Sequence, residues 1–397
     1  MARPRQHASV ILMVLVTIAF AAAALLAFTE RAMDDLIQPT RVVNANRLRA
    51  EAYSAMETVL AVLVDWRAAN GNNLRSPTEG WDNILNEDWV GYAPYDEHRT
   101  VTVTFDDESG KLSLPAISDQ NLVNYFTYYG LGADQAAFLK DTLLTWMRPN
   151  YTPTSAGAYT TAQYQEDTLP FSPPGRSLRS WAELASIEGL RAPSAEVNEG
   201  DPYFFYLDGR PTPLGKRFMH AFSLYNFTTP NANGALHYPD TIAILGQMSP
   251  QQQEEVVHFL RTKESGSATV PNTGFFTQAA QVQSVAGTLS APAGMGVNIT
   301  ALRINVTVKQ GLAVFTLSVL VTWPNGATAV AAPAPPSQAT TATNTTNQVT
   351  TTPLTTVQLN YPYTVLELKE SDLDPDDPAV QTAAAELETP LLNPPST

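Results

Sequence analysis

The stretch RQHASVILMVLVTIAF (Arg5–Phe20) decides how the chain begins. A short leader with Arg3 and Arg5 runs into an apolar segment, and no charged residue occurs between Ser9 and Phe28. About twenty residues of α-helix are enough to cross the hydrocarbon core of a bilayer. The two arginines before the segment favour a cytoplasmic N-terminus and an exported remainder. The sequence therefore predicts a single membrane-crossing helix.

A cleaved secretory signal is the competing interpretation of this segment. Such signals have a shorter apolar core followed by a small-residue cut site, which the Ala21–Ala24 run can supply.

The helical pattern continues past the apolar segment. Asn70-Gly71 is a typical C-terminal stop, so we expect one helix over residues 9–71, apolar all round in its first half and amphipathic in its second. Pro39 is expected to kink or split it, because proline removes a backbone hydrogen bond. The residues that share the apolar face of the second half are Ala52, Met56, Val59, Leu60, Leu63 and Val64.

Composition narrows the class of protein. The chain has 397 residues and a formal net charge of -15, which argues against a nucleic-acid partner because phosphates need a dense basic face. It contains no cysteine, so disulfides, thiolate catalysis and cysteine-based zinc sites are excluded. At this length we expect two or three domains.

The rest of the chain changes character twice. TVTVTFDDESGKLSLP (Thr100–Pro115) alternates like a strand and turns at Ser109-Gly110, completing a first body segment over 72–117. Residues 118–265 predict paired short helices, with Ser118, Asp134 and Ser180 as N-terminal caps.

Residues 266–370 predict a β-rich second body segment. Its expected strands are FFTQAAQVQSV, ALRINVTVK, AVFTLSVLVTW and VQLNYPYTVLELKE, with a turn at Lys309–Gly311. A flexible Thr-rich loop is expected over 331–356, and an acidic disordered tail over 371–397. The predicted fold class is α+β: a long N-terminal transmembrane and amphipathic helix, an antiparallel sheet and a large helical insert.

This order of segments resembles the type IV pilin and pseudopilin class. In that class prepilin peptidase removes the leader in front of the apolar run, and the helix stays as anchor and assembly spine. The equivalent cut here follows Ala8, where the class has glycine, and makes Ser9 the first mature residue, so that 1–8 is the leader peptide. The fifth mature residue, usually glutamate, is Met13 on the assembly helix.

The missing glutamate is typical of one branch, the K-type minor pseudopilins of type II secretion systems (general secretion pathway protein K). Three further segments are similar to that family: DDESGKLSLP, SWAELASIEGL and NFTTPNANGALHYPD. Ser113 and Pro115 stand where the family has asparagines, and Thr145-Trp146-Met147-Arg148 lacks two family acids. The resemblance implies a pilin-like sheet with a SAM-like helical insert, at the tip of the pseudopilus.

The sequence motifs of common enzyme classes are incomplete or absent in this chain. GRPTPLGKR (Gly209–Arg217) has one residue too many for a phosphate-binding loop, and Arg217 replaces its Ser/Thr. No His-Glu-x-x-His or Gly-x-Ser-x-Gly run occurs. Calcium is a weak alternative at DLDPDD (Asp372–Asp377) or at Asp106, Asp107 and Glu108, and a solvated acidic surface is the favoured interpretation of both.

We therefore predict a structural subunit, not an enzyme, without a cofactor. The resemblance implies a place in the bacterial inner membrane with the bulk in the periplasm. The implied partners are other minor pseudopilins, prepilin peptidase and, as a further candidate, secreted proteins. Three alternatives stay open: a minor pilin of a type IV pilus machine, a single-pass periplasmic sensor or binding protein, and a membrane-anchored hydrolase.

Overall fold

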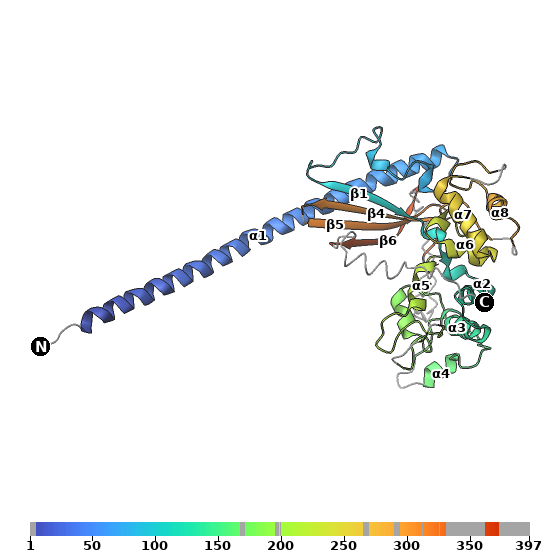
Figure 1. Ribbon diagram of the computed structural model, residues 1–397, viewed down its shortest axis with the longest axis horizontal. Coiled ribbons are helices and arrows are strands. Elements are labelled where there is room, and N and C mark those ends of the chain that lie inside the picture. Colours follow the sequence, from blue (N-terminus) through green and yellow to red (C-terminus); the bar gives the residue numbers. More distant parts are fainter. Residues whose placement is uncertain are drawn as a thin grey trace, which may run out of the picture.

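The computed structural model describes residues 5–166, 171–194, 198, 200–264, 270–289, 294–311, 313–324, 326–330 and 362–372. Within the first helix, side chains 5–12, 27, 30 and 32–44 lie outside the description. The predicted Thr-rich loop (331–356) and nearly all of the predicted acidic tail lie outside the described residues. The fold is α+β, as predicted: a long helix, an antiparallel sheet and a mainly helical insert (Figure 1).

A single helix, α1 (Arg5–Ala69), spans the first 65 described residues. It runs without a break through Pro39, so the expected split is wrong. One proline removes one backbone hydrogen bond, and the remaining ladder on both sides holds the helix together. Only the C-terminal part of α1 lies on the sheet, and the rest extends as a rod away from the body (Figure 1).

The sheet has four antiparallel strands in the order β1-β4-β5-β6. They are β1 (Thr100–Asp106), β4 (Ala301–Gln310), β5 (Ala313–Thr322) and β6 (Thr364–Ser371). Gly311 lies in the predicted turn that joins β4 to β5 as a hairpin. Its φ is +61°, which glycine adopts without steric cost. β6 confirms the strand predicted in Val357–Glu370, although it extends one residue further, to Ser371.

The core of the body forms between α1 and one face of the sheet. Because side chains alternate along a strand, every second residue of β4 and β5 points at the helix. The predicted apolar face of α1 is confirmed: Ala52, Met56, Val59, Leu60 and Leu63 are buried and Val64 packs against them. Their partners across the interface are Leu302, Ile304, Val306, Val308, Phe315, Leu317, Val319 and Val321.

The insert leaves the sheet after β1 and returns at β4, its hydrogen-bonded neighbour. Its first lobe contains α2 (Asp119–Tyr128), α3 (Ala133–Met147), α4 (Thr161–Glu166) and α5 (Pro213–Ala221). Its second lobe contains α6 (Pro239–Gly246), α7 (Pro250–Thr262) and α8 (Ala280–Ala286). Each lobe has its own apolar core. Asp240 joins the two lobes by accepting hydrogen bonds from the hydroxyls of Tyr128 and Tyr129.

Some of the local predictions for the insert are confirmed and others are wrong. Ser118 caps α2 as predicted, by accepting a hydrogen bond from the Asn121 amide. The cap of α3 is Gly132 rather than Asp134, and Ser180 caps a short 3-10 helix (Trp181–Ser186). The expected strand FFTQAAQVQSV is wrong, because its second half forms α8, whose buried Val282 and Ala286 are four residues apart.

Two short strands bring distant segments of the chain together. β2 (Leu112–Ser113) pairs with β3 (Phe222–Ser223) in parallel. The predicted turn at Ser109-Gly110 is confirmed, because a 3-10 helix (Glu108–Gly110) separates β1 from β2. The Ser113 hydroxyl donates to the Tyr225 carbonyl at 2.8 Å and accepts from the Phe227 amide at 3.2 Å. A serine therefore makes one donor and one acceptor contact at a position where the resembling family has asparagine.

The packing of α1 on the sheet predicts a large loss of stability when a buried side chain is shortened. Leu63 is fully buried, so Leu63→Ala should lower the free energy of unfolding of the body by about 2–5 kcal/mol. Denaturant unfolding followed by circular dichroism measures the change. The exposed Glu57→Ala on the same helix is the control and should change it by less than about 0.5 kcal/mol. Equal effects of the two variants would show that this face of α1 does not stabilise the body.

Candidate functional site: an exposed apolar helix and a buried polar junction

The first candidate surface is the N-terminal half of α1. Among the described residues it carries a set of large apolar side chains that are more than half exposed: Met13, Val14, Leu15, Val16, Ile18, Phe20, Leu25, Leu26 and Phe28. Met13 is 74% exposed and Phe20 78%, so these side chains pack on nothing within the described chain. Such a continuous apolar surface is typical of a segment that another apolar phase or partner covers.

The polar side chains on this segment turn their hydrogen bonds inward. The Thr17 hydroxyl donates to the Met13 carbonyl at 2.6 Å, and the Thr29 hydroxyl donates to the Leu25 carbonyl at 2.6 Å. Each threonine therefore satisfies its hydroxyl donor on its own helix.

The predicted processing residues, Ala8 and Ser9, lie in the first turns of α1, and their side chains are outside the described residues. In the described part of the chain, no helix has the length and hydropathy of a membrane span.

The second candidate site is a buried polar junction between the sheet and the insert. It contains Asp107, Ser109 and Asn231, which are 7%, 0% and 1% exposed. Asp107 accepts hydrogen bonds from the Ser109 amide (3.0 Å), the Ser109 hydroxyl (2.6 Å) and the Asn231 side-chain amide (2.7 Å). Because Asp107 follows β1 and Asn231 precedes the 3-10 helix Ala232–Leu236, these bonds tie the sheet to the insert.

The same residues reach two more segments. The Asn231 side-chain amide also donates to the Arg75 carbonyl at 2.9 Å, and the Asn231 backbone amide donates to the Ser109 carbonyl at 2.7 Å. The Ser109 hydroxyl accepts from the Thr300 amide at 3.0 Å, just before β4. Four chain segments that are far apart in sequence therefore meet at one buried network.

Two glycines allow the backbones to approach at this junction. A Cβ on Gly234 would lie 2.4 Å from the Gly110 Cα, and a Cβ on Gly110 would lie 2.8 Å from the Gly234 Cα. Neither position accepts a side chain without moving the other segment. The segments DDESGK and NANGAL, which the resemblance singled out separately, thus face each other here.

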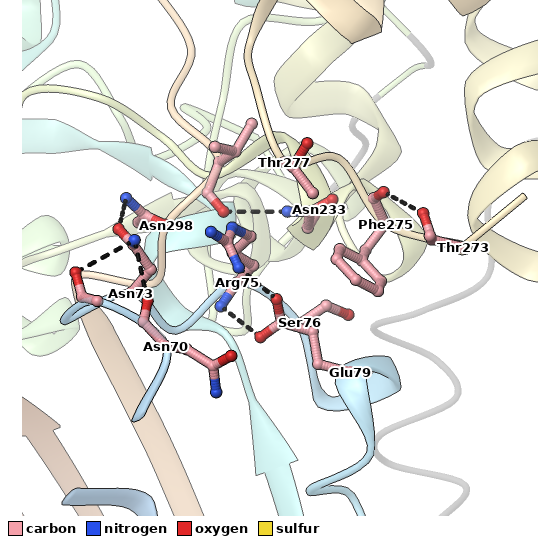
Figure 2. A network of polar contacts seen from close by, with 12 residues as sticks. Asn70, Asn73, Arg75, Ser76, Glu79, Asn233, Thr273, Phe275, Thr277 and Asn298 are labelled. Atoms are coloured by element: carbon pink, nitrogen blue, oxygen red, sulfur yellow. Dashed lines mark hydrogen bonds and ion pairs between the residues drawn. The ribbon is translucent and has the colours of Figure 1, made fainter. Parts of the chain in front are cut away.

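A neighbouring network holds α1's C-terminal loop to the second lobe (Figure 2). The Asn233 side chain donates to the Phe276 carbonyl (3.1 Å) and the Val297 carbonyl (3.0 Å), and it accepts from the Phe276 amide (2.6 Å). Asn298 donates to the Asn73 side chain at 3.0 Å. Asn233 therefore satisfies three backbone groups of loops that have no regular secondary structure.

The acidic group beside the predicted turn is not solvated, so the favoured sequence interpretation is wrong. Glu108 is 4% exposed and contacts Lys111 at 2.9 Å and Arg303 at 3.8 Å. Asp106 accepts from the Tyr238 hydroxyl at 2.6 Å. Within the described residues no three acidic, histidine or cysteine side chains form a metal-binding group. All but the first residue of DLDPDD lies outside the description.

Two other sequence candidates also have structural explanations. Thr212 in GRPTPLGKR caps α5, because its hydroxyl accepts from the Gly215 amide at 3.1 Å. Arg148 pairs with Asp119 at 2.7 Å, at the end of the helical hairpin where the resembling family carries acids.

Comparisons with known proteins give a likeness to solved structures. No family model and no curated protein matches the sequence. Among solved structures, the chain is similar to one from the crystal structure of the GspK-GspI-GspJ complex of the enterotoxigenic Escherichia coli type 2 secretion system. The identity is 12%, the TM-score is 0.45, and the alignment covers 74% of this chain and 96% of that chain. Values this low do not establish a family.

Burial raises the pKa of Asp107 from its usual 3.8 to about 7, against the hydrogen bonds from Ser109 and Asn231 that lower it. Folding therefore favours the protonated carboxyl, and this contribution is lost as the pH rises from about 4 through about 7. The loss corresponds to about 4 kcal/mol.

Asp107→Asn does not titrate and removes this pH dependence. We expect the difference in unfolding midpoint, wild type minus Asp107→Asn, to fall between about pH 4 and pH 7. Thermal unfolding at a series of pH values measures it. Asp134→Asn, which removes an exposed carboxyl, is the control variant measured beside it. A flat difference for Asp107→Asn would contradict the raised pKa.

Proposed function

We propose that this chain is a K-type minor pseudopilin of a type II secretion system, a structural subunit rather than an enzyme. It would lie in the bacterial inner membrane with its body in the periplasm, and later at the tip of a pseudopilus. Its partners would be the other minor pseudopilins, prepilin peptidase and secreted proteins. The proposal takes residues 1–8 as the leader, 9–71 as the spine helix, 72–117 and 266–370 as the two body segments, and 118–265 as the insert. Within 266–370, α8 (Ala280–Ala286) packs on α7 and so belongs with the insert, whereas β4, β5 and β6 form the body.

The observation that carries this proposal is the division of α1 into two surfaces. Its C-terminal half closes the core of the body, whereas the large side chains described from Met13 to Phe28 are apolar and exposed. A helix of this kind needs an apolar environment along its free half. A bilayer supplies that environment before assembly, and the helices of neighbouring subunits supply it afterwards.

The position of the insert supports a place at the end of a filament. In Figure 1 the insert lies at the end of the body opposite to the free half of α1. A further subunit stacked on this end would collide with the two lobes of the insert. The lobes therefore favour a terminal subunit over a repeating one.

The proposal predicts that the mature chain begins at Ser9. Intact mass and N-terminal peptide sequencing, with prepilin peptidase present and absent, measure the start. Ala8→Leu should abolish processing because a large side chain replaces the small residue before the cut. Ala22→Leu, within the apolar run, is the control and should be processed like the wild type. A start near Ala24 would identify a released periplasmic protein, and a chain that stays uncut would favour the sensor alternative.

A further inference from the structure

A second exposed apolar surface lies far from the free half of α1 in sequence. Among described residues outside α1, the two most exposed large hydrophobic side chains are Tyr95 (88%) and Trp89 (62%). Both belong to residues 87–98, which we call the aromatic loop. Tryptophan and tyrosine dominate the binding energy of many protein interfaces. Leaving both rings in water is unfavourable unless other contacts hold the loop in this conformation.

A buried ion pair fixes the loop to α1. Glu51 and Arg99 are each 7% exposed, and Arg99 Nη1 lies 3.1 Å from Glu51 Oε2. Glu51 also accepts from the Tyr92 hydroxyl at 2.8 Å and from the Tyr95 amide at 3.2 Å. A buried carboxylate with these three partners holds both ends of the segment 92–99. The loop is therefore a fixed support that keeps the Tyr95 ring outside.

The loop is also strongly acidic. No lysine or arginine occurs between Arg75 and Arg99, whereas Glu87 and Asp88 precede Trp89 directly and Asp96 and Glu97 follow Tyr95 directly in the sequence. Glu87, Asp88 and Glu97 are exposed. The complementary partner surface is apolar at its centre and carries lysine or arginine at its rim. A second copy of this chain fits poorly because its net charge is -15, and an anionic lipid surface would be repelled.

The loop occupies the end of the body from which α1 projects. Gln310, at the β4–β5 turn, contacts Arg99 at 3.1 Å and Asp96 at 3.0 Å. Glu51 lies one turn beyond Leu48, the first buried side chain described on α1. Figure 1 shows that the free half of α1 extends away from the body on the side of this end of the sheet. A subunit packed alongside that half would meet the aromatic loop.

We propose that the aromatic loop is the docking surface for the body of a neighbouring subunit whose contact surface is apolar and rimmed by lysine or arginine. This inference rests on the proposed function for the identity of the neighbour as an assembly subunit. Trp89 and Tyr95 enter the apolar centre of the contact, and Glu87 and Asp88 pair with the basic rim.

A site-specific cross-link in the assembled system tests the contact. The full-length chain, expressed in its native cells, carries a photoreactive phenylalanine analogue at position 89, or at position 207 as control. Leu207 is 52% exposed and lies in the insert, so it matches position 89 in exposure only. We expect position 89 alone to cross-link to another subunit, through a peptide that mass spectrometry shows to contain apolar residues beside lysine or arginine. Cross-links to lipid, to a second copy of the chain, or equally from both positions would overturn the proposal, as would none.

Binding measurements on the purified full-length chain in detergent, with the cross-linked subunit as probe, test the chemistry. Trp89→Ala should weaken binding about tenfold or more, and Leu207→Ala should not. Glu87→Gln/Asp88→Asn should weaken binding at about 50 mM salt and much less at about 500 mM, because salt screens exposed charges. The matched control is Glu254→Gln/Glu255→Gln on α7, which are also exposed. Equal effects of test and control variants would contradict the docking surface.

These outcomes separate this proposal from the proposed function. Peptidase-dependent processing at Ser9 without a cross-link from position 89 rejects the docking surface and keeps the pseudopilin. A basic-rimmed partner on a chain that stays uncut keeps the docking surface and rejects the pseudopilin.

Discussion

The packing of α1 against one face of the sheet is the interaction on which the other features depend. The stripe from Leu48 to Leu63 fills the space over β4 and β5, and burial of each large apolar side chain contributes about 1.5–3 kcal/mol. Once half of the helix is fixed in this way, the other half has to project from the body, because a continuous helix is stiff. The free apolar surface is therefore a direct consequence of helix continuity through Pro39.

The second constraint is that the insert starts and ends at neighbouring strands. Asp106 and Arg303 are paired across β1 and β4, so about two hundred residues leave and return at one point. Because its two chain connections to the sheet lie side by side, they do not fix the orientation of the insert relative to the sheet. The network of Asp107, Ser109 and Asn231, with the close approach of Gly110 and Gly234, supplies the missing contacts. A buried network with satisfied partners is directional, which apolar packing alone is not.

Both ends of the body thus carry fixed features. At one end, polar contacts orient the two lobes of the insert. At the other, the Glu51–Arg99 pair holds the aromatic loop where α1 leaves the sheet. The buried Glu51 carboxylate lies next to the Arg99 guanidinium, because an unpaired buried charge is strongly destabilising, whereas the Asp107 carboxyl is held by hydrogen bonds from Ser109 and Asn231. The molecule therefore consists of a long helix, a sheet packed on its C-terminal part, and a body whose two ends differ in structure.

The sequence by itself determined the features that depend on local periodicity. The helical stripe of Met56, Val59 and Leu63, the Gly311 turn and the cap at Ser118 follow from spacing and residue type, which act over a few residues. Only the tertiary structure decided the fate of Asp107, which the local pattern assigned to a solvated surface. Its burial depends on Asn231, more than a hundred residues away, and no local rule carries that contact. The same holds for α8, where packing against α7 overrides the strand tendency of its sequence.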